Sequence, residues 1–118
     1  MLHSSEQTFA TRSGATLHAL HWRTDGAAGP GRDSAEARKR TVCIALHGWL
    51  DNAASFDVIA PLICCAGTGF DEIVALDFAG HGASDHRVGT YHPADHVQDV
   101  VDVLFQLGWF VSAENTND

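Results

Sequence analysis

Hydrophobic and polar residues alternate along the chain in a pattern that predicts short strands separated by helices. Two continuous apolar runs, residues 42–46 and 73–76, are typical of strands buried on both faces of a parallel sheet. Nearer the N-terminus, residues 9–12 and 15–22 alternate more loosely around a Ser-Gly turn, which indicates two strands at the rim of the sheet. The mixture of strands and helices predicts an α/β fold.

A first helix is predicted between the two buried strands. Apolar residues at helical spacing cover residues 55–65. Ser55 is expected to be the N-cap, and Asp57 suits the positive end of the helix. Pro61 falls inside this stretch, so we expect the helix to be kinked or split there.

The strongest helical pattern covers residues 93–107. Pro93 suits the first helical position, and Gly108 supplies a C-terminal stop. The residues with i, i+3, i+4, i+7 spacing, expected to form the buried face, are Val97, Val100, Val101, Leu104 and Leu107. The residues expected on the solvent side are Asp95, Asp99 and Asp102.

These elements predict one domain, residues 1–109, interrupted by a linker and followed by a tail. Residues 23–41 are rich in Gly, Ala, Pro and Arg and show no periodicity, so we expect a mobile surface loop. Apolar residues resume at 109–111 and could begin another strand. Residues 110–118 as a whole are mainly polar and are predicted to be a disordered tail.

Composition excludes several classes of protein. The chain has 118 residues, of which 45% are hydrophobic, too many for a disordered protein. No apolar run approaches the roughly 18 residues of a membrane span. The N-terminus lacks a secretion signal, and three cysteines do not form a disulfide framework, so the cytoplasm is the expected location.

The charge distribution argues against nucleic acid as a partner. The formal net charge is −8. From Asp51 onward, the chain contains eleven acidic residues, and Arg87 is the only Lys or Arg residue. This part of the chain therefore cannot neutralise phosphates.

Two glycine-containing segments follow the predicted parallel strands, where open α/β sheets bind their ligands. In the first, HGWLDN at 47–52, Gly48 is expected to let the backbone turn sharply, and the following N–H groups could stabilise an oxyanion. A plain strand-to-helix turn explains this segment equally well. In the second, DFAGHGASD at 77–85, Ser84 does not fit the G-x-S-x-G pattern of a nucleophile, so a structural role is expected.

Together the two segments resemble the α/β-hydrolase superfamily. Within it the similarity is to serine hydrolase-like proteins, with kinship to epoxide hydrolases and haloalkane dehalogenases. The H-G-x and D-x-x-G-x-G-x-S elements, about thirty residues apart, form a specific pair. The resemblance covers residues 15–109 apart from the linker. It implies the N-terminal part of a mostly parallel eight-stranded sheet, with about four strands and two helices present here.

The resemblance also implies roles for individual residues. The backbone N–H of Trp49 would form half of the oxyanion hole. His47 and Gly48 would shape that loop. The positions implied to brace the site without doing chemistry are Asp77, Gly80, Gly82 and Ser84.

The end of the chain departs from the superfamily pattern. In these proteins the long helix leads into the strand of the nucleophile elbow, whereas here the chain continues as FVSAENTND. We therefore expect no complete catalytic set, and an inactive N-terminal fragment of a hydrolase of ester-type or similar small substrates. No cofactor is expected. A small-molecule substrate would bind only if the missing half completed the site. An alternative transcript, a frameshift or a gene-model error would each produce such a chain.

The residues allow two further interpretations. His92 and His96 have the i, i+4 spacing of metal ligands, but the intervening Pro-Ala-Asp differs from H-E-x-x-H, so we expect solvated histidines and no metal.

The alternative function is that of a non-catalytic protein that interacts with a partner or dimerises. In the superfamily's strand order the strand at 42–46 is central, so truncation would leave its edge open to pairing.

Overall fold

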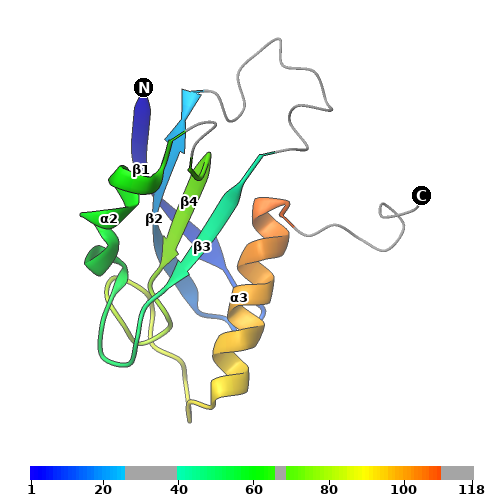
Figure 1. Cartoon of the computed structure of the whole chain (residues 1–118). Helices are drawn as coiled ribbons and strands as arrows, with labels where there is room; N and C mark the ends of the chain where they lie inside the picture. Colours follow the sequence, from blue (N-terminus) through cyan, green and yellow to red (C-terminus); the bar gives the residue numbers. More distant parts are fainter. Residues whose placement is uncertain (26–39, 66–68, 110–118) are drawn as a thin grey trace.

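The computed structural model describes residues 1–25, 40–65 and 69–109, which form one sheet with helices on both faces (Figure 1). The sheet order is β1-β2-β4-β3, with β1 at Leu2–Ala10, β2 at Thr16–Thr24, β3 at Val42–Leu46 and β4 at Glu72–Leu76. The β1/β2 and β2/β4 pairs are antiparallel, and the β3/β4 pair is parallel. The described sheet is therefore mixed.

The two N-terminal strands are longer than predicted. β1 begins at Leu2 and not at residue 9, and every residue of β1 except Phe9 is exposed. An edge strand that is mostly exposed needs no apolar alternation, because pairing with β2 alone positions it. β2 extends to Thr24 and so includes the first residues of the predicted linker. Residues 26–39 of that linker, and the tail predicted over 110–118, lie outside the described residues.

The two buried strands lie close to where the apolar runs predict them. β3 has the predicted bounds, and β4 starts one residue earlier, at Glu72. All five β4 residues are buried, because β2 and β3 flank the strand and helices cover both of its faces. β3 has only β4 as a neighbour among the described strands.

The predicted first helix is split, but not at Pro61. A 3₁₀ helix, η2, covers Ala53–Phe56, and a short helix, α2, covers Ile59–Ile63. Pro61 lies within the first turn of α2, where its missing N–H removes no helical hydrogen bond. Ser55 is not an N-cap. The cap of η2 is Asn52, whose side chain accepts the Ala54 N–H at 2.9 Å.

The long helix α3, Pro93–Leu107, has the predicted bounds, but its buried face is partly wrong. Asp99 is fully buried and Asp102 nearly so, although both were expected in solvent, while Val97 is 63% exposed. The reason is the β1–β2 turn. Arg12 from this turn donates its backbone N–H (3.1 Å) and Nε–H (2.9 Å) to the Asp102 carboxylate.

Each face of the sheet packs against its own helix, with α3 and α2 on opposite sides (Figure 1). The buried residues on the α3 side are Phe9, Ala15, Leu17, Ala19, Val74, Leu76, Ala79 and Val103. Those on the η2 and α2 side are Trp22, Ala53, Ala60, Cys64, Ile73 and Ala75.

Within the described ranges, no helix has the length and apolar character needed to cross a membrane.

Candidate functional site

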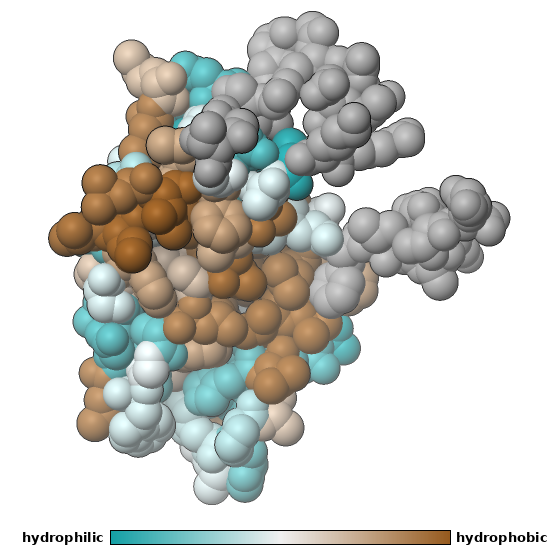
Figure 2. Space-filling model, in the orientation of Figure 1, coloured by the Kyte–Doolittle hydropathy of each residue, from teal (hydrophilic) through white to brown (hydrophobic). Residues whose placement is uncertain are grey.

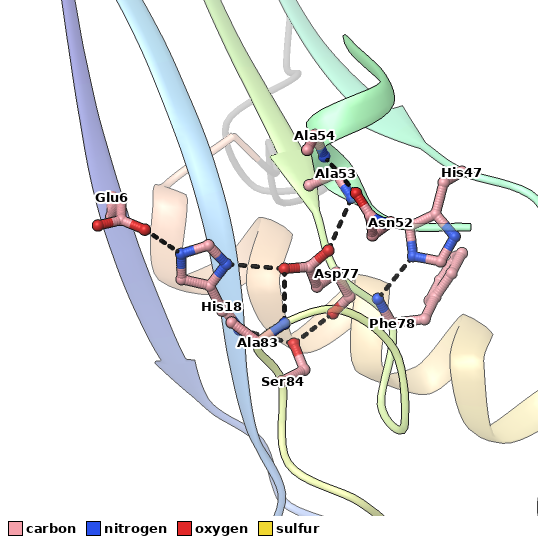
Figure 3. Close-up of polar contacts among 10 residues, drawn as sticks. All are labelled: Glu6, His18, His47, Asn52, Ala53, Ala54, Asp77, Phe78, Ala83 and Ser84. Atoms are coloured by element: carbon pink, nitrogen blue, oxygen red, sulfur yellow. Dashed lines mark hydrogen bonds and ion pairs between the residues drawn. The ribbon is translucent and has the colours of Figure 1, made fainter. Parts of the chain in front are cut away.

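The two sequence motifs meet at one end of the sheet. β3 and β4 are parallel, with Leu46 opposite Leu76, so the segments that follow them emerge side by side. We call residues 47–53 and 77–85 together the loop junction. Figure 3 shows its central contacts.

His47 joins the two loops. Its Nε2 accepts the Phe78 backbone N–H at 3.1 Å, so the ring proton must be on Nδ1, which donates to the Gly48 carbonyl at 2.7 Å. The ring is buried and meets the Phe78 ring edge-on, with centroids 5.0 Å apart. Both ring nitrogens of the histidine in the H-G-x element are therefore engaged in hydrogen bonds within the chain.

Asp77 binds both loops and β2 through one carboxylate (Figure 3). Its Oδ1 accepts the Ala53 N–H at 2.7 Å, while Oδ2 accepts the Ala83 N–H at 3.2 Å and is 2.7 Å from His18 Nδ1. Burial raises the pKa of this carboxyl, but the hydrogen bonds from Ala53, His18 and Ala83 outweigh burial and leave its pKa below the ordinary value. Asp77 is therefore a buried, ionised acceptor that ties the end of the first loop to the second.

His18 is a member of this network that the sequence reasoning missed. Its Nε2 lies 2.8 Å from Glu6 Oε1 on β1. Burial lowers the pKa of His18, but the hydrogen bonds to Asp77 and Glu6 outweigh burial, so the net pKa lies above 6.5. By strand alternation His18 shares a face with Leu20 and Trp22. A histidine beside these two apolar residues on one face of the strand was the available signal.

Ser84 uses its hydroxyl to join backbones. Its Oγ donates to the Asp77 carbonyl at 2.6 Å and accepts the His18 backbone N–H at 2.8 Å. The side chain is buried. With its proton donated to a carbonyl and no base in contact, this hydroxyl is not arranged as a nucleophile.

The glycines of the junction differ in what they require. Gly82 has φ +50°, and a Cβ there would overlap the Asp77 carboxylate. Gly80 has φ +81°, and a Cβ there would lie 2.8 Å from the Tyr91 hydroxyl oxygen. Gly48, in contrast, has open space around it and no positive φ. The expected turn does begin at Gly48, because the Asp51 N–H donates to the Gly48 carbonyl at 3.1 Å, but its left-handed residue is Leu50, with φ +64°, and not the glycine.

Trp49 lies at the exposed tip of the first loop. The residue is 76% exposed, and its ring meets the His81 ring edge-on, with centroids 5.6 Å apart. His81 Nε2 in turn accepts the Leu50 N–H at 3.2 Å. Within the described ranges the backbone N–H of Trp49 has no hydrogen-bond partner. It therefore remains available as a donor.

The two histidines of the long helix do not share one environment. His92 is exposed at the N-cap, as expected. His96 is not a solvated residue, because its ring packs 4.9 Å from that of Phe78 and 5.9 Å from that of Tyr91. Burial keeps the pKa of His96 below its ordinary value. Among the described residues, no three His, Cys, Asp or Glu side chains gather as a metal site would require.

Comparison with solved structures establishes the class of fold. A hypothetical protein from Pseudomonas aeruginosa aligns with a TM-score of 0.67 and 37% identity, over 89% of this chain and 31% of that one. An α/β hydrolase from Novosphingobium aromaticivorans aligns with a TM-score of 0.66 and 23% identity, over 92% of this chain and 33% of its own. The structure is thus a partial α/β-hydrolase fold, as the motifs predict.

Sequence comparison identifies homologues of this chain. A serine hydrolase-like protein of Dictyostelium discoideum is 44% identical over 68 residues, which are 56% of this chain and 18% of the relative. The Homo sapiens serine hydrolase-like protein is 41% identical over 56% of this chain and 32% of its own length. No family model matches the chain. The chain is homologous to serine hydrolase-like proteins, and it spans a third or less of the length of these two relatives.

Proposed function

We propose that this chain supplies the oxyanion-loop part of a serine hydrolase-like α/β-hydrolase. The observation that carries the proposal is the free backbone N–H of Trp49, at the tip of a loop that His47 and Asp77 hold at its two ends. A fixed N–H with no internal partner can donate to the oxyanion that develops during acyl transfer. The substrate class proposed is an ester or a similar small molecule.

The chain alone is proposed to be inactive. Its buried serine at the junction, Ser84, has a hydroxyl committed to two backbone partners. We expect a fluorophosphonate probe to label neither the chain nor its Ser84→Ala variant. Labelling that disappears in Ser84→Ala would contradict the structural role proposed for Ser84.

The role of Trp49 is tested in a chimera, in which this chain replaces the segment of a serine hydrolase-like relative that aligns with it. Trp49→Pro removes the N–H, whereas Trp49→Phe keeps it. We expect Trp49→Pro to lower kcat for a nitrophenyl ester by about 10²-fold or more, as loss of an oxyanion donor does elsewhere. Trp49→Phe should retain most of the activity. Equal rates for the two variants would overturn the proposed role.

A second candidate function is association through the edge of β3. On the described sheet this edge is unpaired, and an apolar cleft of about 190 Å³ lies beside it. We call this cleft the β3–α3 groove; its lining residues are Leu46, Phe78, His96, Val97, Val100 and Val101. Figure 2 shows hydrophobic residues across the surface where β3 and α3 lie. An unpaired apolar strand edge favours pairing with another strand, including that of a second copy.

The oligomeric state separates the two candidates. Pairing through β3 predicts a dimer or larger species in size-exclusion chromatography with light scattering, at micromolar concentrations. A monomer under those conditions would contradict the second candidate and leave the first unaffected. The cytoplasmic location likewise stays a prediction, which imaging of the tagged chain in cells would test.

A further inference from the structure

The contacts of His18 indicate that a residue outside both sequence motifs helps to set the geometry of the loop at 47–53, which we call the oxyanion loop. We propose that His18 is a positioning residue, held as an imidazolium between Glu6 and Asp77, and that the geometry of the loop at 47–53 depends on its second proton. The inference rests on the proposed function only in calling this segment the oxyanion loop. The coupling itself concerns contacts within this chain.

The proton count follows from the partners of the ring. Nδ1 lies 2.7 Å from Asp77 Oδ2, and Nε2 lies 2.8 Å from Glu6 Oε1. Ionised carboxylates only accept hydrogen bonds, so both nitrogens must carry hydrogen for both contacts to form. A neutral ring has one N–H and can satisfy only one of the two. The observed arrangement therefore corresponds to the imidazolium form.

The ring is connected to the oxyanion loop through one residue. The Asp77 carboxylate that receives His18 also accepts the Ala53 N–H at 2.7 Å, and Ala53 is the last residue of that loop. The backbone of His18 is tied to the same region, because its carbonyl accepts the Asp77 N–H at 2.9 Å and its N–H donates to Ser84. A change in the charge or position of His18 thus reaches both halves of the junction.

The charged groups that face His18 are carboxylates. Glu6 faces it from β1 and Asp77 from the end of β4, and these two raise its pKa. Asp85, from the second loop, accepts the Thr16 N–H at 3.0 Å, two residues along β2. Asp57, which follows η2, lines the same cleft as Glu6. No described cation contacts the His18 ring, so raising the pH removes the one positive charge in this group.

Loss of the proton has a defined structural consequence. The neutral ring releases either Glu6 or Asp77. If the donor to Asp77 is lost, the carboxylate keeps only the two backbone N–H groups of Ala53 and Ala83. These two bonds must then readjust, which loosens the anchor of the oxyanion loop. The amides of Ala53 and Ala83 are therefore the natural reporters.

The experiment is a pH titration of the isotope-labelled chain by NMR, from about pH 5.5 to about pH 9, above the range in which carboxyls titrate. We expect the Ala53 and Ala83 amide resonances to move with one midpoint, above the ordinary histidine value and equal to that of the His18 ring. His86→Gln, at an exposed histidine, is the matched control and should leave the transition unchanged. Reporters that do not follow the His18 ring would overturn the proposal.

Two variants distinguish positioning by charge from simple packing. His18→Gln should abolish the transition. Glu6→Gln should keep it but lower its midpoint by about 0.5 pH unit, because a partly screened carboxylate is removed. Glu6 is 75% exposed, so this variant tests the proposal even if His18→Gln does not fold. A midpoint unchanged in Glu6→Gln would contradict the proposal.

The outcome is separate from that of the proposed function. The titration needs no activity, whereas the Trp49→Pro chimera needs no titration. An active Trp49→Pro chimera with a normal titration would reject the oxyanion role and retain the His18 coupling. The reverse result would retain the oxyanion role and reject the coupling.

Discussion

The end of β3 and the side of β3 differ sharply. At the end, in the loop junction, the buried groups of His47, Asp77 and Ser84 all have hydrogen-bond partners within the chain. At the side, in the β3–α3 groove, Leu46 is 43% exposed and Val97 is 63% exposed. The junction is thus internally satisfied, whereas the groove is a hydrophobic surface that the described residues leave uncovered. Phe78 belongs to both regions, because it lies in the second loop and also lines the groove.

The most severe test of the junction is Gly82→Ala. The new Cβ would overlap the Asp77 carboxylate, and the backbone has φ +50°. We expect a loss of about 3 kcal/mol in the free energy of unfolding, from overpacking and backbone strain together. Urea denaturation measures it. The matched control is Gly48→Ala, which has open space and should change stability by less than about 0.5 kcal/mol. Similar losses for both variants would show that the junction is not tightly constrained.

Asp77→Asn tests the charge at the centre of the junction. The amide cannot accept all three N–H groups that the carboxylate accepts, so we expect a loss of about 2 kcal/mol near neutral pH. The pKa of Asp77 is lowered on folding, so its contribution is present above the ordinary value of 3.8 and is lost as the pH falls through the folded pKa. The difference between wild type and variant should shrink in acid. Denaturation curves at several pH values would reveal a constant difference if this account were wrong.

Asp99→Asn tests whether a buried carboxylate with an unpaired oxygen stabilises the fold. Asp99 is fully buried, but among the described residues its Oδ2 has no partner, and burial raises its pKa. Ionisation then opposes folding above the ordinary carboxyl pKa of 3.8. We expect Asp99→Asn to stabilise the fold by about 1 kcal/mol near pH 7.

The matched variant for Asp99 is Asp102→Asn on the same helix. The Asp102 carboxylate accepts hydrogen bonds from the Nε–H (2.9 Å) and the backbone N–H (3.1 Å) of Arg12. We expect destabilisation of about 1 kcal/mol, since a charge-assisted bond is lost. Thermal denaturation of the pair measures both signs. Changes in stability of the same sign for both variants would contradict the distinction between hydrogen-bonded and unpaired carboxylates.

The smallest effect on stability is expected in the groove. Leu46→Lys places a charge at a partly exposed position, so the free energy of unfolding should change by less than about 0.5 kcal/mol. If β3 mediates association, the same change should abolish it, because a lysine at a strand edge opposes pairing. Val88→Lys, at a fully exposed position away from the groove, is the control. Light scattering that shows equal dimer fractions for both variants would exclude the β3 edge as the interface.

The sequence predicted best the elements whose own residues determine them. β3 and α3 have the predicted bounds because a run of five apolar residues, or a proline start and a glycine stop around a periodic helix, needs no distant partner. β1 was mostly missed for the opposite reason. Its polar residues carry no strand pattern, and only pairing with β2 makes them a strand.

The candidate site shows the same division. The motif residues and the meeting of their two loops follow from sequence, because both loops come directly after predicted parallel strands, whose carboxyl ends lie at one edge of the sheet. The burial of Asp99 and Asp102 does not, since Ser13 and Arg12 reach them from nearly ninety residues away in the chain. The same holds for His18 and Glu6, which meet only through the register of β1 and β2. Residue type and spacing set the strands, the helix ends and the loops, whereas long-range contact set which polar groups became buried partners and which apolar surface was left open.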